Sequence, residues 1–338
     1  MRHPSAGFVA SVLAVLCAAG CGSADKAESG TIAVQAEPIR VDPHQHRQML
    51  AAEADAAKSA GEYQVALTLF RRILADNPTS TIAYVGIGEV YLLQEDWVRA
   101  EPVFARAVRL EPRSFDAQYG HGIALQMIER FVDAVKAYHR ALTIRPESVE
   151  ANLHLATTYL QMGEPRSAQV FAEKVVEVDP AHGPGRAALG SVYVELGRYR
   201  EAITQYEAAV ELMEPTPPLL INLINALGKM DRYIDARNTA EYLVKLAPSA
   251  EGYERLGWAN FRMGDYDESI EAYRRAVAVE ADYWQAHNGV GCNALNAWLL
   301  SGKQNTGALG EAKRSFRQSL RANPYQPRVV SLLSKYGV

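Results

Sequence analysis

Residues 81–112 carry the pattern that decides the fold, TIAYVGIGEVYLLQEDWVRAEPVFARAVRLEP. Apolar residues recur at helical spacing in Ile82–Leu93 and again in Val98–Leu110, which predicts two short helices. The polar residues 94–96 separate these helices and predict a turn. Pro112 follows the second helix and ends it, because proline lacks an N–H group and disfavours helical geometry in the residue before it. The stretch therefore predicts one helix–turn–helix unit.

The same unit returns along most of the chain. The first helix of each unit has a column of mostly small residues at Ala54, Gly88, Gly122, Ala156, Gly190, Ile224, Gly257 and Gly291. The second helix has an alanine column at Ala66, Ala100, Ala134, Ala168, Ala202, Ala236, Ser269 and Ala312. An aromatic column follows four residues later at Phe70, Phe104, Tyr138, Tyr206, Tyr273 and Phe316. Nearly every step in the small and alanine columns is 34 residues long. The exceptions are one step of 33 in each of these columns and one step of 43 before Ala312. The columns therefore predict eight stacked helix pairs.

The first and last units depart from this pattern. The first has Glu53 and Ala57 where an apolar and an aromatic residue are usual, which predicts an N-terminal cap. The eighth has a step of 43 residues instead of 34, nine more than usual. We predict that Ala294–Leu300 extends its first helix and that a loop follows around Ser301–Gly307.

Two inner units also depart. The fourth has Ala172 in the aromatic column. The sixth has Ile224 in the small column and Ala240 in the aromatic column, and it begins with the proline-rich residues 215–218. Because prolines restrict the backbone, this joint is stiff, and we expect the regularity of the stack to falter there.

The period of 34 and the small, aromatic and proline columns resemble the tetratricopeptide repeat. The resemblance covers residues 47–326 and implies an all-α, right-handed superhelical α-solenoid of about eight repeats. Residues 327–338 are expected to form a C-terminal capping helix, because an open solenoid end exposes apolar surface.

The first 20 residues have the features of a secretory signal peptide. Arg2 precedes an apolar run from Phe8 to Leu16, which is too short to span a bilayer. The following residues, Ala18-Ala19-Gly20-Cys21, resemble a bacterial lipobox, which implies that Cys21 is lipidated after cleavage. An ordinary secreted protein that is cut nearby, with Cys21 incidental, is the alternative.

Residues 21–46 are rich in Ala, Ser, Glu and Pro and are predicted to be a flexible tether. Gly22 follows the lipobox cysteine, where an Asp would favour the inner membrane, so we expect a lipid anchor in the outer membrane facing the periplasm. Cys17 would leave with the signal peptide. Cys292 would then be the one remaining thiol, predicted to be buried and inert.

Composition and motifs argue against several function classes. Apolar residues make up 48% and charged residues 22%, as in a folded protein, and the net charge of −4 comes without a basic cluster for nucleic acid. There is no zinc-binding, phosphate-binding, nucleophile-elbow or haem motif. The histidines are scattered over different units, so we predict no catalytic residue, no metal and no cofactor.

The first helices of a solenoid line a concave groove that binds partners. Projection of the repeat predicts an apolar N-terminal half of the groove at Ile82, Val85, Glu89, Leu92, Tyr119, Ile123, Leu153, Thr157 and Leu160. It predicts a half rich in Asn, Arg and Trp at Ile221, Asn222, Asn225, Glu254, Arg255, Trp258, Asn288 and Asn296. Alternatively, the asparagines are ordinary repeat residues and the aliphatic residues pack between units. A carboxylate clamp is matched only by Asn222 and Arg255.

The sequence thus predicts a lipid-anchored scaffold that binds proteins or peptides in the cell envelope, for assembly, secretion or complex maintenance. The membrane would be contacted through the lipid alone. Two alternatives stay open: a scaffold that associates with copies of itself, and a non-catalytic regulatory subunit of an envelope enzyme such as a wall hydrolase or peptidase.

Overall fold

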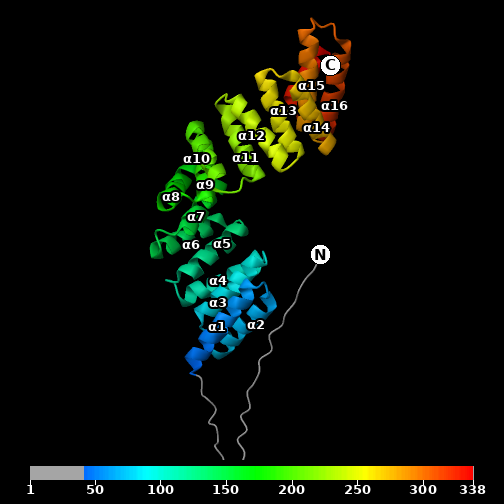
Figure 1. The fold of residues 1–338 in the computed structure, drawn as a ribbon. Coiled ribbons are helices and arrows are strands. Elements are labelled where there is room, and N and C mark those ends of the chain that lie inside the picture. Colours follow the sequence, from blue (N-terminus) through cyan, green and yellow to red (C-terminus); the bar gives the residue numbers. More distant parts are fainter. Residues whose placement is uncertain (1–41, 338) are drawn as a thin grey trace, which may run out of the picture. The chain divides into compact units, whose positions relative to one another are not determined.

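The computed structural model describes residues 42–337, in which helices follow one another from α1 to α17 (Figure 1). The first helices of the pairs are α1 (Pro43–Ser59), α3 (Thr81–Leu93), α5 (Phe115–Met127), α7 (Val149–Gln161), α9 (Gly183–Glu195), α11 (Pro217–Lys229), α13 (Ala250–Met263) and α15 (Trp284–Leu300). The second helices are α2 (Tyr63–Asp76), α4 (Trp97–Leu110), α6 (Phe131–Ile144), α8 (Pro165–Val178), α10 (Tyr199–Leu212), α12 (Tyr233–Leu246), α14 (Tyr266–Val279) and α16 (Thr306–Ala322). The last helix is α17 (Pro327–Tyr336). The predicted all-α solenoid of eight pairs is confirmed.

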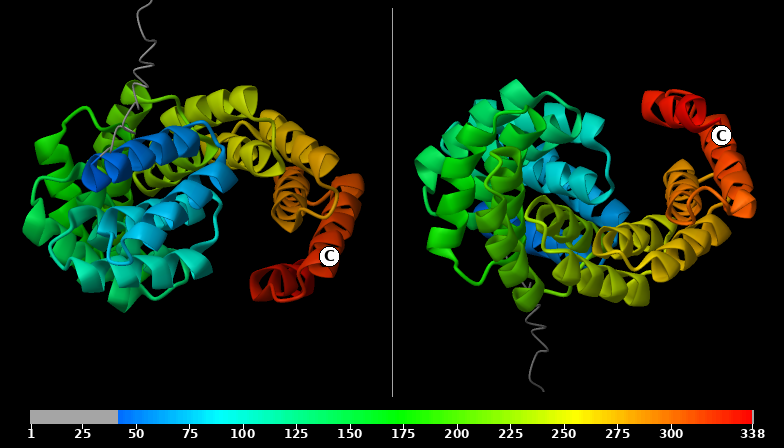
Figure 2. Two further views of the ribbon diagram at one scale, coloured as in Figure 1. Left: turned by 90° about the horizontal axis from the view of Figure 1, so that it is seen from below. Right: turned by 90° about the horizontal axis from the view of Figure 1, so that it is seen from above.

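Consecutive pairs pack in chain order, and Figure 2 shows them following a curved path. From α3 to α13, each first helix contacts the first helix of the next pair as well as its own partner. Each second helix from α2 to α14 contacts the first helix of the pair that follows. Because the first helices approach one another directly, they lie on the inner side of the curve.

The aromatic column holds the pairs together. The ring of Phe104 is fully buried and lies against Gly88 of its own pair and Gly120 of the next pair. Tyr273 lies in the same way between Gly257 and Gly289. A side chain at these glycines would occupy the space of the ring, so the small residues are needed for the helices to cross this closely.

The sixth pair has a large residue in the small column and a small residue in the aromatic column, and these two departures compensate for each other. Ile224 and Ala240 are both fully buried in one apolar cluster, so the larger side chain stands on the first helix and the smaller one on the second. The volume that the missing aromatic ring leaves is thus filled from the opposite helix.

The N-terminal boundary differs from the prediction. Helix α1 begins at Pro43, which places His44 and His46 on a helix instead of in the predicted tether. Residues 43–46 continue the helix that packs Leu50 and Ala54 into the first apolar cluster. The predicted signal peptide and most of the tether lie outside the described residues.

The C-terminal end of the stack is close to the prediction. Helix α15 extends to Leu300, but α16 begins at Thr306, so the additional residues lengthen both helices and the loop is shorter than expected. Helix α17 packs Val329 onto the last pair, where Tyr336 contacts Trp298 with ring centroids 6.2 Å apart. It therefore covers apolar surface as a capping helix does.

Candidate protein-binding surface

We call the side of the stack formed by α3, α5, α7, α9, α11, α13 and α15 the first-helix surface. All seventeen predicted groove residues lie on these helices and none is fully buried. Ile82, Asn222 and Asn225 are exposed, and the others are partly exposed. The structure therefore leaves these side chains accessible, and many of them line three cavities on this surface.

The first of these, the N-terminal cavity, has a volume of about 620 Å³ between α1, α3 and the start of α5. The predicted residues Ile82, Val85 and Glu89 line it. It is less apolar than the sequence predicted, because the carboxylates of Asp55, Glu89, Glu111 and Asp116 also line it, with Lys58 as the one lining cation. The prediction of an apolar N-terminal half is therefore wrong for this part of the surface.

The Lys58 ammonium group does not balance these carboxylates. Its Nζ lies 2.8 Å from Asp55 Oδ1 and also contacts Glu89, which joins α1 to α3. Asp116 has a long ion pair with Arg145, at 3.5 Å. The acidic groups come from three successive units, and no single helix shows this cluster.

The central cavity, of about 430 Å³, lies between α7, α9 and α11. The predicted residues Leu153, Thr157 and Asn222 line it, together with Met213 at the end of α10 and Pro218 from the proline-rich joint. The joint thus forms part of a cavity wall, which the sequence did not predict.

Two polar groups in the wall of the central cavity are already hydrogen-bonded. Ser191 Oγ lies 3.1 Å from the Tyr206 hydroxyl. His154 Nδ1 lies 3.2 Å from Gln126 Oε1, and burial lowers the pKa of this histidine, which favours its neutral form. The central cavity is therefore mostly apolar and suits apolar side chains of a partner.

The C-terminal cavity has a volume of about 380 Å³ and lies between α13, α14 and α15. The predicted residues Glu254, Trp258 and Asn288 line it. The sequence did not predict Trp284 and Gln285, which begin α15 and also line it. The spacing of Trp284, Gln285 and Asn288 on one helix was the signal that could have identified this wall.

Glu254 is mostly buried, and this burial raises the pKa of its carboxyl group. Arg255 Nη1 lies 3.5 Å from Glu254, and Arg255 Nη2 lies 3.2 Å from Glu251. Because its guanidinium group is held by two carboxylates, Arg255 is poorly placed to bind the carboxylate of a partner. The geometry therefore argues against a carboxylate clamp at this position.

Cys292 also departs from the prediction. It is partly buried and lines the C-terminal cavity, whereas we expected a fully buried thiol. Burial raises the pKa of the thiol, which favours the less reactive protonated form. Position 292 comes directly after Gly291 of the small column, at the edge of the helix contact.

The histidines that the sequence left unassigned have local partners. The ring of His182 caps α9 by accepting a hydrogen bond from the N–H of Gly185 at 3.0 Å. His139 Nε2 lies 3.0 Å from the hydroxyl of Tyr159. Within residues 42–337, no group of three or more His, Cys, Asp or Glu side chains could hold a metal ion.

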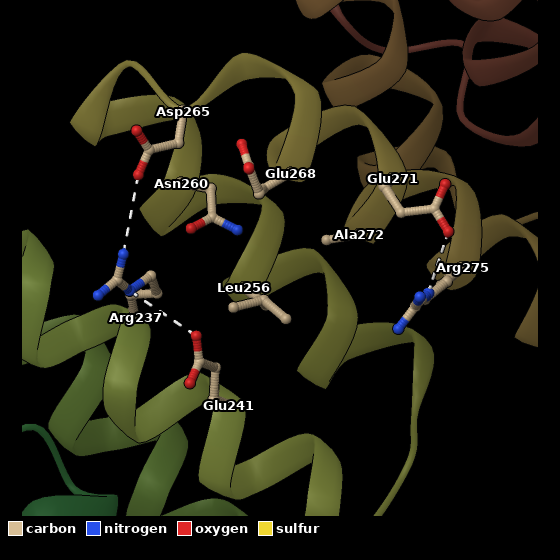
Figure 3. Close-up of a pocket in the computed structure, with 9 residues that line it drawn as sticks. All are labelled: Arg237, Glu241, Leu256, Asn260, Asp265, Glu268, Glu271, Ala272 and Arg275. Atoms are coloured by element: carbon tan, nitrogen blue, oxygen red, sulfur yellow. Dashed lines mark hydrogen bonds and ion pairs between the residues drawn. The ribbon is translucent and has the colours of Figure 1, made fainter.

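A further cavity of about 390 Å³ opens on the side of the second helices α12 and α14 (Figure 3). Arg237 lies between Glu241 and Asp265, at 3.7 and 3.8 Å, and Arg275 pairs with Glu271 at 3.2 Å (Figure 3). Its charged groups largely satisfy one another in the solvated seam between second helices, so we do not assign a ligand to it.

Sequence comparison agrees with the repeat architecture. Models of the tetratricopeptide repeat match residues 51–115, 94–149, 129–192, 185–213 and 221–289. The heat shock protein STI1 of Saccharomyces cerevisiae is 34% identical over 77 residues, which are 22% of this chain. The match spans only 13% of the length of that relative.

Solved structures show the same fold at low sequence identity. A structure described as the functional characterization of Pseudomonas aeruginosa pilF has a TM-score of 0.55 at 18% identity, over 61% of this chain and 93% of that one. A tetratricopeptide repeat protein from Parabacteroides merdae has a TM-score of 0.52 at 16% identity, over 70% of this chain and 94% of that one.

A stack of helix pairs with cavities along its inner side defines a repeat scaffold that interacts with other proteins. With the column pattern and the matched repeats, this chain belongs to the tetratricopeptide repeat family.

Proposed function

We propose that this protein is a membrane-anchored scaffold that binds proteins or peptides in the bacterial cell envelope, for assembly, secretion or complex maintenance. The observation that carries the proposal is the row of three cavities on the first-helix surface. Each is lined by side chains from at least two successive pairs, so an extended partner would contact several repeats at once. Such a partner gains affinity from many small contacts, as peptides in repeat grooves do.

The proposal assigns different partner chemistry to different parts of the surface. The N-terminal cavity offers carboxylates beside Ile82, which is 65% exposed. The central cavity offers mostly apolar side chains around Leu153 and Met213. A partner segment with both basic and apolar residues therefore complements the surface, and the scaffold contributes binding energy and geometry, not a chemical step.

We expect a photoreactive amino acid at Tyr119, on α5, to crosslink the partner in cells, because this side chain is partly exposed on the first-helix surface. The matched control is the same amino acid at Val132, which is 58% exposed on the second helix α6. Mass spectrometry of the adducts identifies the partner. Equal crosslinking to the same protein from both positions would contradict binding at the first-helix surface, and adducts between two copies of this chain would show self-association instead.

The membrane anchor is the second part of the proposal, and it rests on the sequence Ala18-Ala19-Gly20-Cys21. No helix within residues 42–337 is long and apolar enough to cross a membrane. Cleavage before Cys21 would place the lipid at the N-terminus of the mature chain, ahead of the tether. We place the anchor in the outer membrane, facing the periplasm, because Gly22 stands where an Asp would favour the inner membrane.

Cys21→Ala is expected to release the protein from membranes, because it removes the thiol that would carry the lipid. Cys17→Ala is the matched control and is expected to leave membrane association unchanged, since Cys17 would be lost with the signal peptide. The measurement is the membrane-bound fraction after washing with high salt and carbonate. Continued tight association of the Cys21→Ala protein would contradict lipidation.

A further inference from the structure

We infer that the C-terminal cavity binds a lysine side chain of the partner protein. The inference rests on the proposed function, because it specifies one contact of the proposed scaffold. It follows from the carboxylate, carbonyl and aromatic groups that converge on this one cavity, and no single group would be sufficient.

The first observation is the charge of the cavity. Glu254 lies in its wall with a side chain only 14% exposed. The charged groups around it are Glu251 and Arg255 on the same helix, and Arg262 two turns further on, which also lines the cavity and is paired with Asp231 at 3.6 Å. The carboxylates are those of Glu254, Glu251 and Asp231, and the guanidinium groups are those of Arg255 and Arg262. This leaves one negative charge without a partner, and a cation in the cavity would neutralise it.

The second observation is a pair of amide oxygens in the same wall. Gln285 Oε1 and Asn288 Oδ1 are both buried and accept no hydrogen bond. The amide of Asn288 cannot simply turn over, because its Nδ2 donates to Gln326 Oε1 at 2.7 Å. Gln326 is itself fixed by donating to Ser319 O at 3.1 Å and Asn323 O at 2.7 Å. The negative end of the Asn288 dipole is therefore uncompensated in a region of low dielectric, where it favours a cation.

The third observation is the aromatic lining. Trp258, Phe261 and Trp284 line the cavity, as does Tyr273, whose ring lies between Gly257 of α13 and Gly289 of α15. Trp258 is held in place because its ring meets Tyr233 edge-on at 5.9 Å and its tip packs against Gly228 of the preceding pair. Aromatic faces attract ammonium groups and also pack on methylene groups.

A lysine side chain combines the features that this cavity complements. Its four methylene groups suit the indole rings. Its compact ammonium group would pair with Glu254, where the Asn288 dipole also favours a positive charge. Arg262 does not occupy the site, because its guanidinium group stacks over the ring of Tyr233 at 4.6 Å. The volume of about 380 Å³ is at the small end of the range for ligand pockets and suits one long side chain.

The test uses the full chain in detergent, labelled with 5-fluorotryptophan, and two probes: N-acetyl-lysine methylamide and N-acetyl-norleucine methylamide, which lacks the ammonium group. The four tryptophans give separate ¹⁹F signals, of which Trp97 and Trp298 lie outside the cavity. We expect the lysine probe to shift the signals of Trp258 and Trp284 with a Kd at least tenfold lower than that of the norleucine probe. Equal Kd values for the two probes, or equal shifts at all four tryptophans, would overturn the inference.

Glu254→Gln is expected to reduce the lysine preference to less than threefold, because it removes the charge and keeps the shape. Glu268→Gln is the matched control: its carboxylate lies on α14 but does not line the cavity, so the preference should stay near tenfold. Unchanged Trp97 and Trp298 signals show that each variant is folded. If Glu254→Gln does not fold, Gln285→Met tests the same wall and should weaken lysine binding at least threefold. A lysine preference that survives in the variant tested rejects the inference.

The result is separable from the proposed function. Crosslinking from Tyr119 reports on α5, which does not line the C-terminal cavity. Partner crosslinking without a lysine preference rejects this inference alone. Loss of specific crosslinking rejects the proposed function as well.

Discussion

Phe104→Ala is expected to lower the free energy of unfolding by about 3–5 kcal/mol, the usual range for removing a buried phenyl ring. Phe104 has no exposed surface, and its ring lies between Gly88 of α3 and Gly120 of α5. The cavity left by the ring would therefore separate two successive pairs as well as the two helices of one pair. Since Gly88 and Gly120 have no side chains, neither can fill the space.

Urea unfolding followed by circular dichroism measures this loss. The control is Val98→Ala, six residues before Phe104 on the same helix. Val98 is 74% exposed, so its truncation should change stability by less than about 0.5 kcal/mol. Solenoid repeats are stabilised mainly by their neighbours, so hydrogen exchange should accelerate in α3–α6 while α13–α16 stay protected. An equal acceleration at both ends would show that the stack unfolds as one unit and that the local account is wrong.

The repeat columns were sufficient to predict the fold because each column corresponds to one contact. Gly88 with Phe104, Gly122 with Tyr138 and Gly190 with Tyr206 are each 16 residues apart and lie in contact. A contact of small residue and ring therefore forms within each of these pairs. The period itself predicts the order of the helices, because neighbours in sequence are neighbours in space in a solenoid.

The contact between one pair and the next was harder to predict. Each ring also meets the residue 16 positions further along the chain, which is Gly120 for Phe104 and Gly289 for Tyr273. The ring of Phe70 meets Gly86 in the same way, but the residue 16 positions after Tyr138 is His154, so the position was not recognised as a column. His154 stacks on Tyr138 there, with ring centroids 5.8 Å apart.

The same position explains where the central cavity lies. Asn222 follows Tyr206 by 16 residues, is exposed, and lines the cavity beside the Tyr206 ring. A glycine there would let the backbone close on the ring, as at Gly120. The proline-rich joint before α11 adds to the gap, because Thr216 and Pro218 line the cavity instead of packing into the pair.

The charge of the first-helix surface could not be predicted from one repeat at a time. Ile82 and Val85 indicate an apolar face when α3 is taken alone. Asp55 and Asp116 approach that face from α1 and α5, and Glu111 from the loop before α5. The acidity of the N-terminal cavity is thus a property of packing between units. In contrast, Trp258 and Glu254 could be predicted because both lie on a single helix.

Gly120→Ala is expected to lower the free energy of unfolding by about 3 kcal/mol, at the upper end of the range for overpacking a core. A Cβ atom at Gly120 would overlap the ring of Phe104, well inside van der Waals contact. The ring cannot move away, because the Cα of Gly88 is on its other side and a Cβ there would lie only 2.7 Å from the ring. Helix α5 would have to shift away from α4, which would weaken every contact between the second and third pairs.

A matched control is Gly310→Ala, in the first turns of α16, where an added Cβ has its nearest neighbour at 3.5 Å and the substitution should be neutral or slightly stabilising. The steric account also predicts a rescue. Phe104→Leu removes part of the ring that the new methyl group would meet, so the double variant should be more stable than the sum of the two single losses, by about 1 kcal/mol or more. Additive losses would mean that Gly120 is needed for a reason other than the ring of Phe104.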